Sequence, residues 1–147
     1  MLKELTSNYY INVAMVAWIS AQVLKTLFSF IVNKKFNPGR LVGAGGMPSA
    51  HSALVCSLTV AMARGIGFNS PEFAICFIVA GVVMYDAMGV RRAAGEQAKV
   101  LNKLVFEDKD NENKPEKALK EFLGHTPLEV LGGALLGILV AALMPLA

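Results

Sequence analysis

The distribution of apolar residues constrains the fold of this chain more than any other feature. Apolar residues form 54% of the 147 residues and charged residues only 17%, and the apolar ones are gathered in long blocks. The first block, Tyr9 to Val32, would form a helix of about 36 Å, long enough to cross a bilayer. The others cover about Pro48 to Ile66, Pro71 to Tyr85, and the stretch that follows Gly124–Glu129 and runs to the C-terminus. The sequence therefore predicts an all-α membrane bundle of about four transmembrane helices, in a single domain over residues 1–147.

A different pattern follows the third block. From Val90 the apolar residues recur at intervals of three or four, at Ala94, Ala98, Leu101 and Val105, with charged residues off that stripe. This pattern predicts an amphipathic helix that lies at the membrane interface or against the bundle. Residues 107–116 are polar with mixed charge and a proline, and we expect them to form a mobile linker.

Charge and cysteine content argue against some classes of function. The net charge of +3 is small and evenly spread, so we expect no nucleic acid as a partner. The two cysteines, Cys56 and Cys76, fall inside apolar blocks and lack the spacing of a metal site. We interpret them as small packing residues.

The glycine-rich stretch Gly43–Ser52 precedes the second block and is the most distinctive polar segment. Pro48 suits the first position of a helix, and the following N–H groups would then lack intrahelical partners. Such a helix start binds anions, because free N–H groups coincide with the positive end of the helix dipole. Ser49 adds a hydroxyl donor, and His51 adds a group that exchanges protons near neutral pH. Taken alone, the stretch is also typical of an ordinary glycine-rich turn.

The fourth block carries its own helix-start signals. Thr126 fits an N-cap, Pro127 the first helical position, and Glu129 the carboxylate of a capping box. Further along, Gly133 and Gly137 would allow another helix to approach closely.

Four spans would bring the unusual polar residues to one membrane face. The first and third connections would share that face, and both termini would lie on the other. The residues expected at the shared face are Lys25, Arg40, Ser49, His51, Asp86, Arg91, Arg92, His125 and Glu129. At the opposite face the charged residues are Lys3, Glu4, Arg64 and Glu72. This convergence predicts a functional site at the shared face.

The chemistry that such residues support is narrow. Fixed cations beside a helix N-terminus suit a phosphate and its transition state. Two histidines could act as nucleophile and as proton donor, and a carboxylate could orient one of them. Alternatively, His51 and His125 could bind a metal together with Asp86 or Glu129. The flanking cations would repel a divalent ion, so we expect no metal and no cofactor.

Three elements, in this order, resemble a known superfamily. They are Met47–Ser52, Tyr85–Ala98 and Leu123–Val130. Together they are similar to the divergent bacterial and plant membrane branch of the type-2 phosphatidic acid phosphatase superfamily, which includes the vanadium haloperoxidases. The similarity extends from Gln22 to the C-terminus.

The resemblance implies roles for individual residues. His125 matches the histidine that attacks phosphorus, and Glu129 stands where the family has the carboxylate that orients it. His51 matches the histidine that protonates the leaving group, and Ser49 matches the phosphate-binding serine. Asp86, at the end of the third block, would hold an arginine or orient a histidine.

The phosphate-binding cations have rival candidates. Lys34 and Arg40 lie near the spacing of the family's lysine and arginine. Lys25 is a rival for the lysine, if its side chain turns into the bundle and does not extend to the interface. The family's arginine before the nucleophilic histidine is absent, and Arg91 or Arg92 could supply that charge.

The sequence thus predicts a membrane phosphatase that hydrolyses a phosphate ester or diphosphate, most simply of a lipid, through a phosphohistidine. The alternatives are a non-catalytic binder or carrier of phosphorylated lipid and a structural or assembly protein. The expected partners are the bilayer and a phosphate-bearing substrate. The oligomeric state is left open, with a homo-oligomer as one alternative. Because the connections around the site carry most of the cations, the positive-inside rule predicts a plasma-membrane protein whose site faces the cytoplasm.

Overall fold

A computed structural model describes residues 2–34, 46–107, 118–119, 121 and 124–146 of the chain. These residues form helices and short connections, and no strand occurs among them. The helices are α1 (Leu2–Thr6), α2 (Tyr9–Asn33), α3 (Ala50–Gly65), α4 (Pro71–Met88), α5 (Val90–Glu107) and α6 (Pro127–Leu143). The predicted linker at 107–116 lies, apart from Glu107 at the end of α5, outside the described residues.

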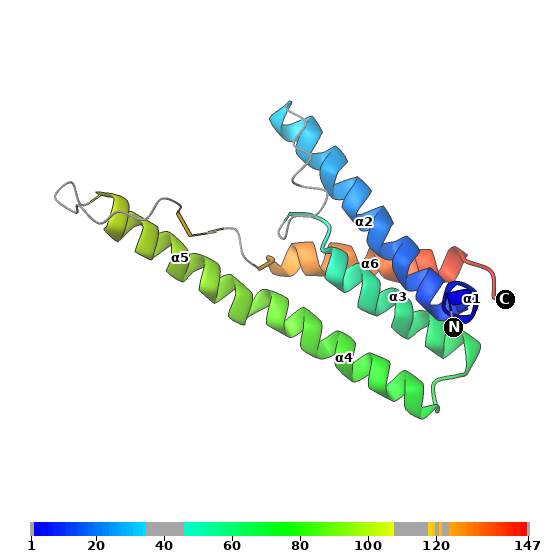
Figure 1. The fold of residues 1–147 in the computed structure, drawn as a ribbon. Coiled ribbons are helices and arrows are strands. Elements are labelled where there is room, and N and C mark those ends of the chain that lie inside the picture. The colour runs from blue at the N-terminus through cyan, green and yellow to red at the C-terminus, as the bar shows by residue number, and fades with distance from the viewer. Residues whose placement is uncertain (1, 35–45, 108–117, 120, 122–123, 147) are drawn as a thin grey trace.

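Helix α3 is the centre of the bundle and packs against α2, α4 and α6. Figure 1 shows α2 and α4 on either side of it, with α6 crossing behind and both termini at one end. Helices α3 and α6 begin near each other and run in the same direction. As a result, the starts of α3 and α6 and the end of α4 meet at the end of the bundle remote from the termini (Figure 1).

Small residues allow α3 and α6 to approach closely. A Cβ atom added at Gly133 would collide with the carbonyl oxygen of Ser49, and one at Gly137 with that of Ala53. Both backbones therefore touch, which confirms the close approach expected from the two glycines. The start of α3 also packs on α2 through alanines: Ala50 and Ala53 cluster with Ala17 and Ala21.

The polar side chains of α3 are compatible with its central position. Ser57 donates a hydrogen bond to the carbonyl of Leu54 (2.9 Å), and Thr59 donates one to that of Val55 (2.7 Å). Both hydroxyl groups thus find an acceptor on their own helix, and the Thr59 hydroxyl also lies 3.2 Å from the carbonyl oxygen of Cys76 on α4. These contacts explain how α3 remains buried among other helices.

The all-α membrane bundle predicted from the apolar blocks is confirmed. Two helical stretches, Tyr9–Ile31 and Pro71–Phe106, are long and apolar enough to cross a membrane, and α6 is a shorter apolar helix. Helix α4 leaves most of its large apolar side chains exposed on the bundle surface, as expected of a lipid-facing helix. Together α2, α3, α4 and α6 form the bundle.

The amphipathic segment expected from Val90 is α5. It continues the line of α4 and projects beyond the bundle (Figure 1). Asn102 on α5 holds part of the returning chain: its side-chain amide accepts from Leu119 N and donates to Leu119 O, both at 2.8 Å. An interfacial position for α5 remains a prediction.

One helix boundary differs from the expected one. Pro48 was expected at the first helical position, but α3 begins at Ala50 with Ser49 as its N-cap. The cap competes successfully because the Ser49 hydroxyl accepts a hydrogen bond from the N–H of Ser52 (3.3 Å). Pro48 therefore precedes the cap.

Candidate functional site at the convergent helix starts

The start of α6 has the geometry that its sequence predicts. The Thr126 hydroxyl accepts from the N–H of Glu129 (3.3 Å), and the Glu129 carboxylate accepts from the N–H of Thr126 (2.8 Å). These two bonds close a capping box, with Pro127 in the first turn. The box fixes the Glu129 side chain on the outside of the first turn, pointing back toward the residue before the cap.

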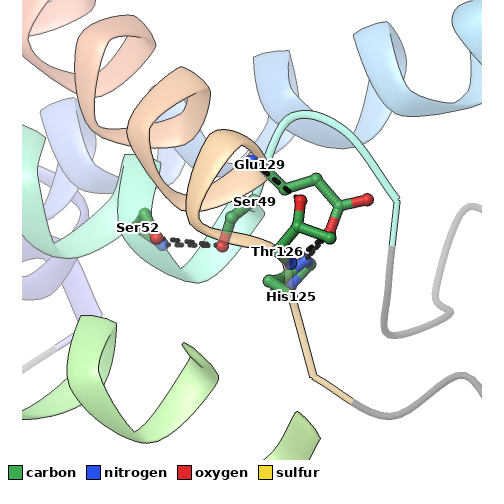
Figure 2. Close-up of polar contacts among 5 residues, drawn as sticks. All are labelled: Ser49, Ser52, His125, Thr126 and Glu129. Carbon is green, nitrogen blue, oxygen red and sulfur yellow. Dashed lines mark hydrogen bonds and ion pairs between the residues drawn. The ribbon is translucent and has the colours of Figure 1, made fainter. Parts of the chain in front are cut away.

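That residue is His125, and its imidazole meets the same carboxylate. His125 Nδ1 lies 3.4 Å from Glu129 Oε2, the oxygen that also accepts from Thr126 N–H. Figure 2 shows the histidine and the carboxylate side by side beneath the first turn of α6. Glu129 thus closes the capping box and orients the histidine at once, where the sequence left the choice between the two roles open. With the Nδ1 proton directed at the carboxylate, Nε2 carries the free lone pair.

The backbone on both sides of His125 is held by the end of α4. The N–H of His125 donates to the carbonyl of Ala87 at 2.9 Å. Gly124 has a φ of +86°, and a Cβ atom there would collide with the backbone of Arg92. Only glycine meets both conditions, so Gly124 allows the loop to lie directly on the junction of α4 and α5.

The start of α3 lies against the start of α6. The N–H of Ser49 donates to the carbonyl of Glu129 at 3.0 Å. The Ser49 hydroxyl accepts from the N–H and, at 3.0 Å, from the hydroxyl of Ser52 (Figure 2). In the first turn, Ala50 and His51 contribute N–H groups that no intrahelical carbonyl can reach. Two helix N-termini, each the positive end of a dipole, therefore converge.

Two cations act on the histidines of this site. Lys25 on α2 is only 3% exposed, so its side chain turns into the bundle and does not extend to the interface. Both Lys25 and Arg91 interact electrostatically with His51 and with His125, and the two histidines interact with each other. Charged residues that lie far apart in the sequence are thus close enough in space to act on the same two histidines.

Asp86 and Arg91 form an ion pair at the junction of α4 and α5. Arg91 Nε lies 2.6 Å from Asp86 Oδ2. Because the carboxylate engages Nε, the terminal nitrogens of the guanidinium are left to face other groups. Of the two roles that the sequence left open for Asp86, the structure has the one in which the carboxylate holds an arginine.

Burial is the main influence on the pKa of the His125 imidazole. Burial lowers its pKa below the ordinary value of 6.5, and the nearby cations Lys25 and Arg91 lower it further, while the Glu129 carboxylate acts in the opposite direction. The net effect is a lowered pKa, so the lone pair of the ring is available near neutral pH. His125 itself is 5% exposed.

The remaining predicted residues lie at varying distances from this centre. Lys34 is exposed at the C-cap of α2, Arg92 does not act on either histidine, and Arg40 lies outside the described residues. Ser49 joins the site by its backbone, but its side chain is 0% exposed and engaged in capping. Its hydroxyl thus acts as an N-cap, and the expected contact of that hydroxyl with phosphate remains a prediction.

Sequence reasoning missed Ser52 and gave Gln22 no role of its own. The Ser52 hydroxyl donates to that of Ser49, and Gln22, which its spacing places on one helical face with Lys25, lies on α2 one turn before it. Ser52 belongs to the Met47–Ser52 element and could have been found from the i, i+3 relation to the cap. Among the described residues, no group of three or more His, Cys, Asp or Glu side chains is placed to hold a metal ion.

The fold and these side chains define a class: a polytopic all-α membrane protein with a polar centre where helix starts converge. The chain belongs to the divergent PAP2 family, whose model matches residues 6–140. It is similar to the uncharacterized membrane protein YuiD of Bacillus subtilis (strain 168), with 42% identity over 152 residues and 96% of each chain covered. No solved structure matches the chain. The resemblance seen in the three sequence elements is thereby confirmed.

Proposed function

We propose that this protein is a metal-independent phosphatase that hydrolyses a phosphate ester or diphosphate of a lipid through a phosphohistidine on His125. The observation that carries the proposal is the His125–Glu129 pair, set where two helix N-termini converge. Membership of the divergent PAP2 family supports a phosphatase-like activity.

In the first step, Nε2 of His125 attacks phosphorus and the bond from phosphorus to the leaving oxygen breaks. Glu129 stabilises the imidazolium that forms. Lys25 and Arg91 stabilise the charge that grows on the phosphoryl oxygens, with Asp86 positioning the guanidinium. His51, exposed in the first turn of α3, donates a proton to the leaving oxygen.

In the second step, His51 accepts a proton from water, and the oxygen of that water attacks phosphorus. The P–N bond breaks, phosphate leaves, and His125 returns to its neutral form. Fixed cations supply the charge stabilisation throughout, so the scheme needs no divalent metal. The apolar bundle around the site favours a substrate with an apolar tail.

A site facing the cytoplasmic side of the plasma membrane is part of the proposal. The connections near the site carry Lys34, Lys35 and Arg40 and the cations from Arg91 to Lys120, whereas the connection between α3 and α4 follows Arg64 alone. A reporter fused to the C-terminus and active only in the cytoplasm should be inactive. Activity of that reporter would contradict the orientation.

A second function is a non-catalytic binder or carrier of phosphorylated lipid. The low exposure of His125 favours it, because a nucleophile needs access to phosphorus. Release of phosphate from a short-chain lipid phosphate by the pure protein separates the two functions. The phosphatase should keep its rate after treatment with a chelator and should be inhibited by vanadate, whereas the binder gives no release. Loss of activity on chelation, restored by one metal, would contradict the metal-independent scheme.

A further inference from the structure

One buried side-chain oxygen in the described part of the chain has no hydrogen-bond partner, and it belongs to Gln22. The side chain is only 8% exposed, and its amide oxygen Oε1 accepts no hydrogen bond. Buried amide groups are nearly always paired, because an unpaired one loses its bonds to water without replacement. An orphaned acceptor inside a bundle therefore calls for a functional explanation.

Gln22 lies beside the candidate site. It precedes Lys25 by three residues and so shares one face of α2 with it, about 5–6 Å away. The neighbouring Ala21 clusters with Ala50 and Ala53 at the start of α3. Gln22 is therefore level with the first turn of α3, one helical turn deeper in the bundle than Lys25.

The chemistry of the position is specific. A carbonyl oxygen only accepts hydrogen bonds, so its complement is a hydroxyl or an amide N–H. If phosphate lies near Lys25 and Arg91, the part of the substrate that extends inward from phosphate passes Gln22. The distance of about 5–6 Å between Lys25 and Gln22 on α2 corresponds to a few covalent bonds in the substrate. A group that donates to Gln22 would therefore lie a few bonds from phosphorus.

We infer that Gln22 is a specificity-determining residue, which selects lipid phosphates that carry a hydrogen-bond donor close to the phosphate. This inference rests on the proposed function for the position of the phosphate. It narrows the substrate class: lipid phosphates with a free hydroxyl or an amide N–H near the phosphate satisfy Gln22, whereas polyprenyl phosphates and glycerol phosphates with both other hydroxyls esterified, which lack a donor there, do not. A site that hydrogen-bonds a substrate group discriminates against the analogue lacking it, because the buried partner is then left unpaired.

A purely structural role is disfavoured by the same orphaned oxygen. If Gln22 served packing alone, an apolar side chain of similar length could replace it without loss of stability. Removal of an unpaired buried acceptor even stabilises the fold. Gln22→Met should consequently melt at the same temperature as the wild type or a few degrees higher. A functional glutamine predicts lost selectivity together with unimpaired stability.

The test measures binding of three alkylphosphonates to the purified full-length protein in detergent. They have equal chain length and carry a hydroxyl, a hydrogen or a methoxy group on the third carbon from phosphorus. Their C–P bond is not hydrolysed, so affinity is measured apart from turnover. The wild type should bind the hydroxyl compound about tenfold more tightly than the other two. Gln22→Met should bind all three alike, with the affinity of the hydrogen compound.

The matched control is Gln97→Met, the same chemical change at an exposed position of α5, which should keep the tenfold preference. Equal binding of the three compounds by the wild type, no binding of any, or a preference that survives in Gln22→Met would overturn the inference. So would equal affinity for methoxy and hydroxyl compounds, because a methoxy group cannot donate. Hydrolysis of the matching phosphate esters is assayed separately: the preference without hydrolysis would retain the role of Gln22 and refute the phosphatase.

Discussion

The two ends of the bundle use cations in opposite ways. At the end that holds the termini, Arg64 donates to the carbonyls of Ala141 and Met144, the latter at 2.9 Å. Tyr9 adds a hydroxyl donor to Met144 O at 3.4 Å. These carbonyls are the last of α6, where the helix dipole is negative, so a cation there stabilises the fold.

At the other end, Lys25 and Arg91 act on histidines set at helix starts, where the dipoles are positive. A cation in that position opposes the dipoles and gains nothing for stability from them. The presence of cations therefore does not distinguish the two ends of the bundle, whereas the sign of the cations relative to the neighbouring helix dipoles does. The predictions that follow separate the two ends by asking which changes impair activity and which impair stability.

The largest effect is expected from His125→Ala. Without the nucleophile, turnover of a lipid phosphate should fall by at least about 10⁴-fold, and no phosphoenzyme should be trapped. The melting temperature should change little, because the capping box of Thr126 and Glu129 remains. Phosphate release and acid-quenched labelling measure both. A phosphoenzyme that persists in the variant would reverse the assignment of nucleophile.

His51→Ala should show an effect that depends on the leaving group. An alcohol leaves with a proton, so removal of the His51 imidazole should lower the rate of alcohol release by about 10²–10⁴-fold. Nitrophenolate needs little protonation, so the rate of its release should fall much less. The N–H groups at the start of α3 survive the substitution, so phosphate binding should weaken only modestly. Rates measured with both leaving groups decide the matter, and equal losses would exclude His51 as the general acid.

The lowered pKa of His125 predicts the acid limb of the activity profile. Attack on phosphorus needs the neutral His125 ring. With a nitrophenyl ester, which needs little protonation by His51, kcat/KM should therefore remain high down to pH 6.5 and fall about tenfold per unit only below the lowered pKa. The unfolded chain binds the proton more readily than the folded one. The contribution to stability is therefore present above pH 6.5 and is lost as pH falls through the folded pKa.

Rate profiles and melting temperatures between pH 4.5 and 8 test this on the same protein. The acid loss of stability should be smaller in His125→Asn, which has no proton to bind at that position. A rate that already halves above pH 6.5 would contradict a lowered pKa.

Gly133→Ala should disturb the contact that brings the two helix starts together. Its Cβ atom would collide with the Ser49 carbonyl and approach the Ser52 Cβ to 3.0 Å, a misfit costing about 1–3 kcal/mol. Because that contact belongs to the site end, kcat should fall as well. Gly81→Ala, on the exposed surface of α4 with nothing within 4 Å, is the control and should be neutral or stabilising. Similar destabilisation by both would contradict the close approach of α3 and α6.

The elements with strong local signals were predictable from the sequence. The apolar blocks predicted α2, α4 and α6, and Thr126, Pro127 and Glu129 predicted the start of α6. Two features were not predictable: that the Lys25 side chain turns into the bundle, and that Arg91 and not Arg92 acts on the histidines. Both depend on which face of a helix meets its neighbours. A polar residue in an apolar block can face either the bundle or the membrane interface.

The start of α3 shows another limit. Proline at the first helical position and serine at the N-cap are both favourable, and here they compete over adjacent residues. The hydrogen bond from the N–H of Ser49 to the carbonyl of Glu129 favours the serine cap, and its acceptor lies 80 positions further along the chain. No local pattern encodes such a contact. The orphaned oxygen of Gln22 is equally invisible to sequence reasoning, because it becomes apparent only when all neighbours are in place.

The smallest effect is expected at the end that holds the termini, from Arg64→Met. The variant keeps the length of the side chain and removes a cation and its hydrogen bonds at the end of α6, a loss of about 1 kcal/mol. For a chain of this size the melting temperature should fall by about 2–4 °C. Turnover per folded molecule should not change, because Arg64 acts on neither histidine.

Arg91→Met is the matched substitution at the site end and should show the reverse, with turnover lost and the melting temperature nearly unchanged. Melting curves and phosphate release on the same preparations compare them. A loss of turnover in Arg64→Met as large as in Arg91→Met would mean that the two ends do not differ in the use of their cations.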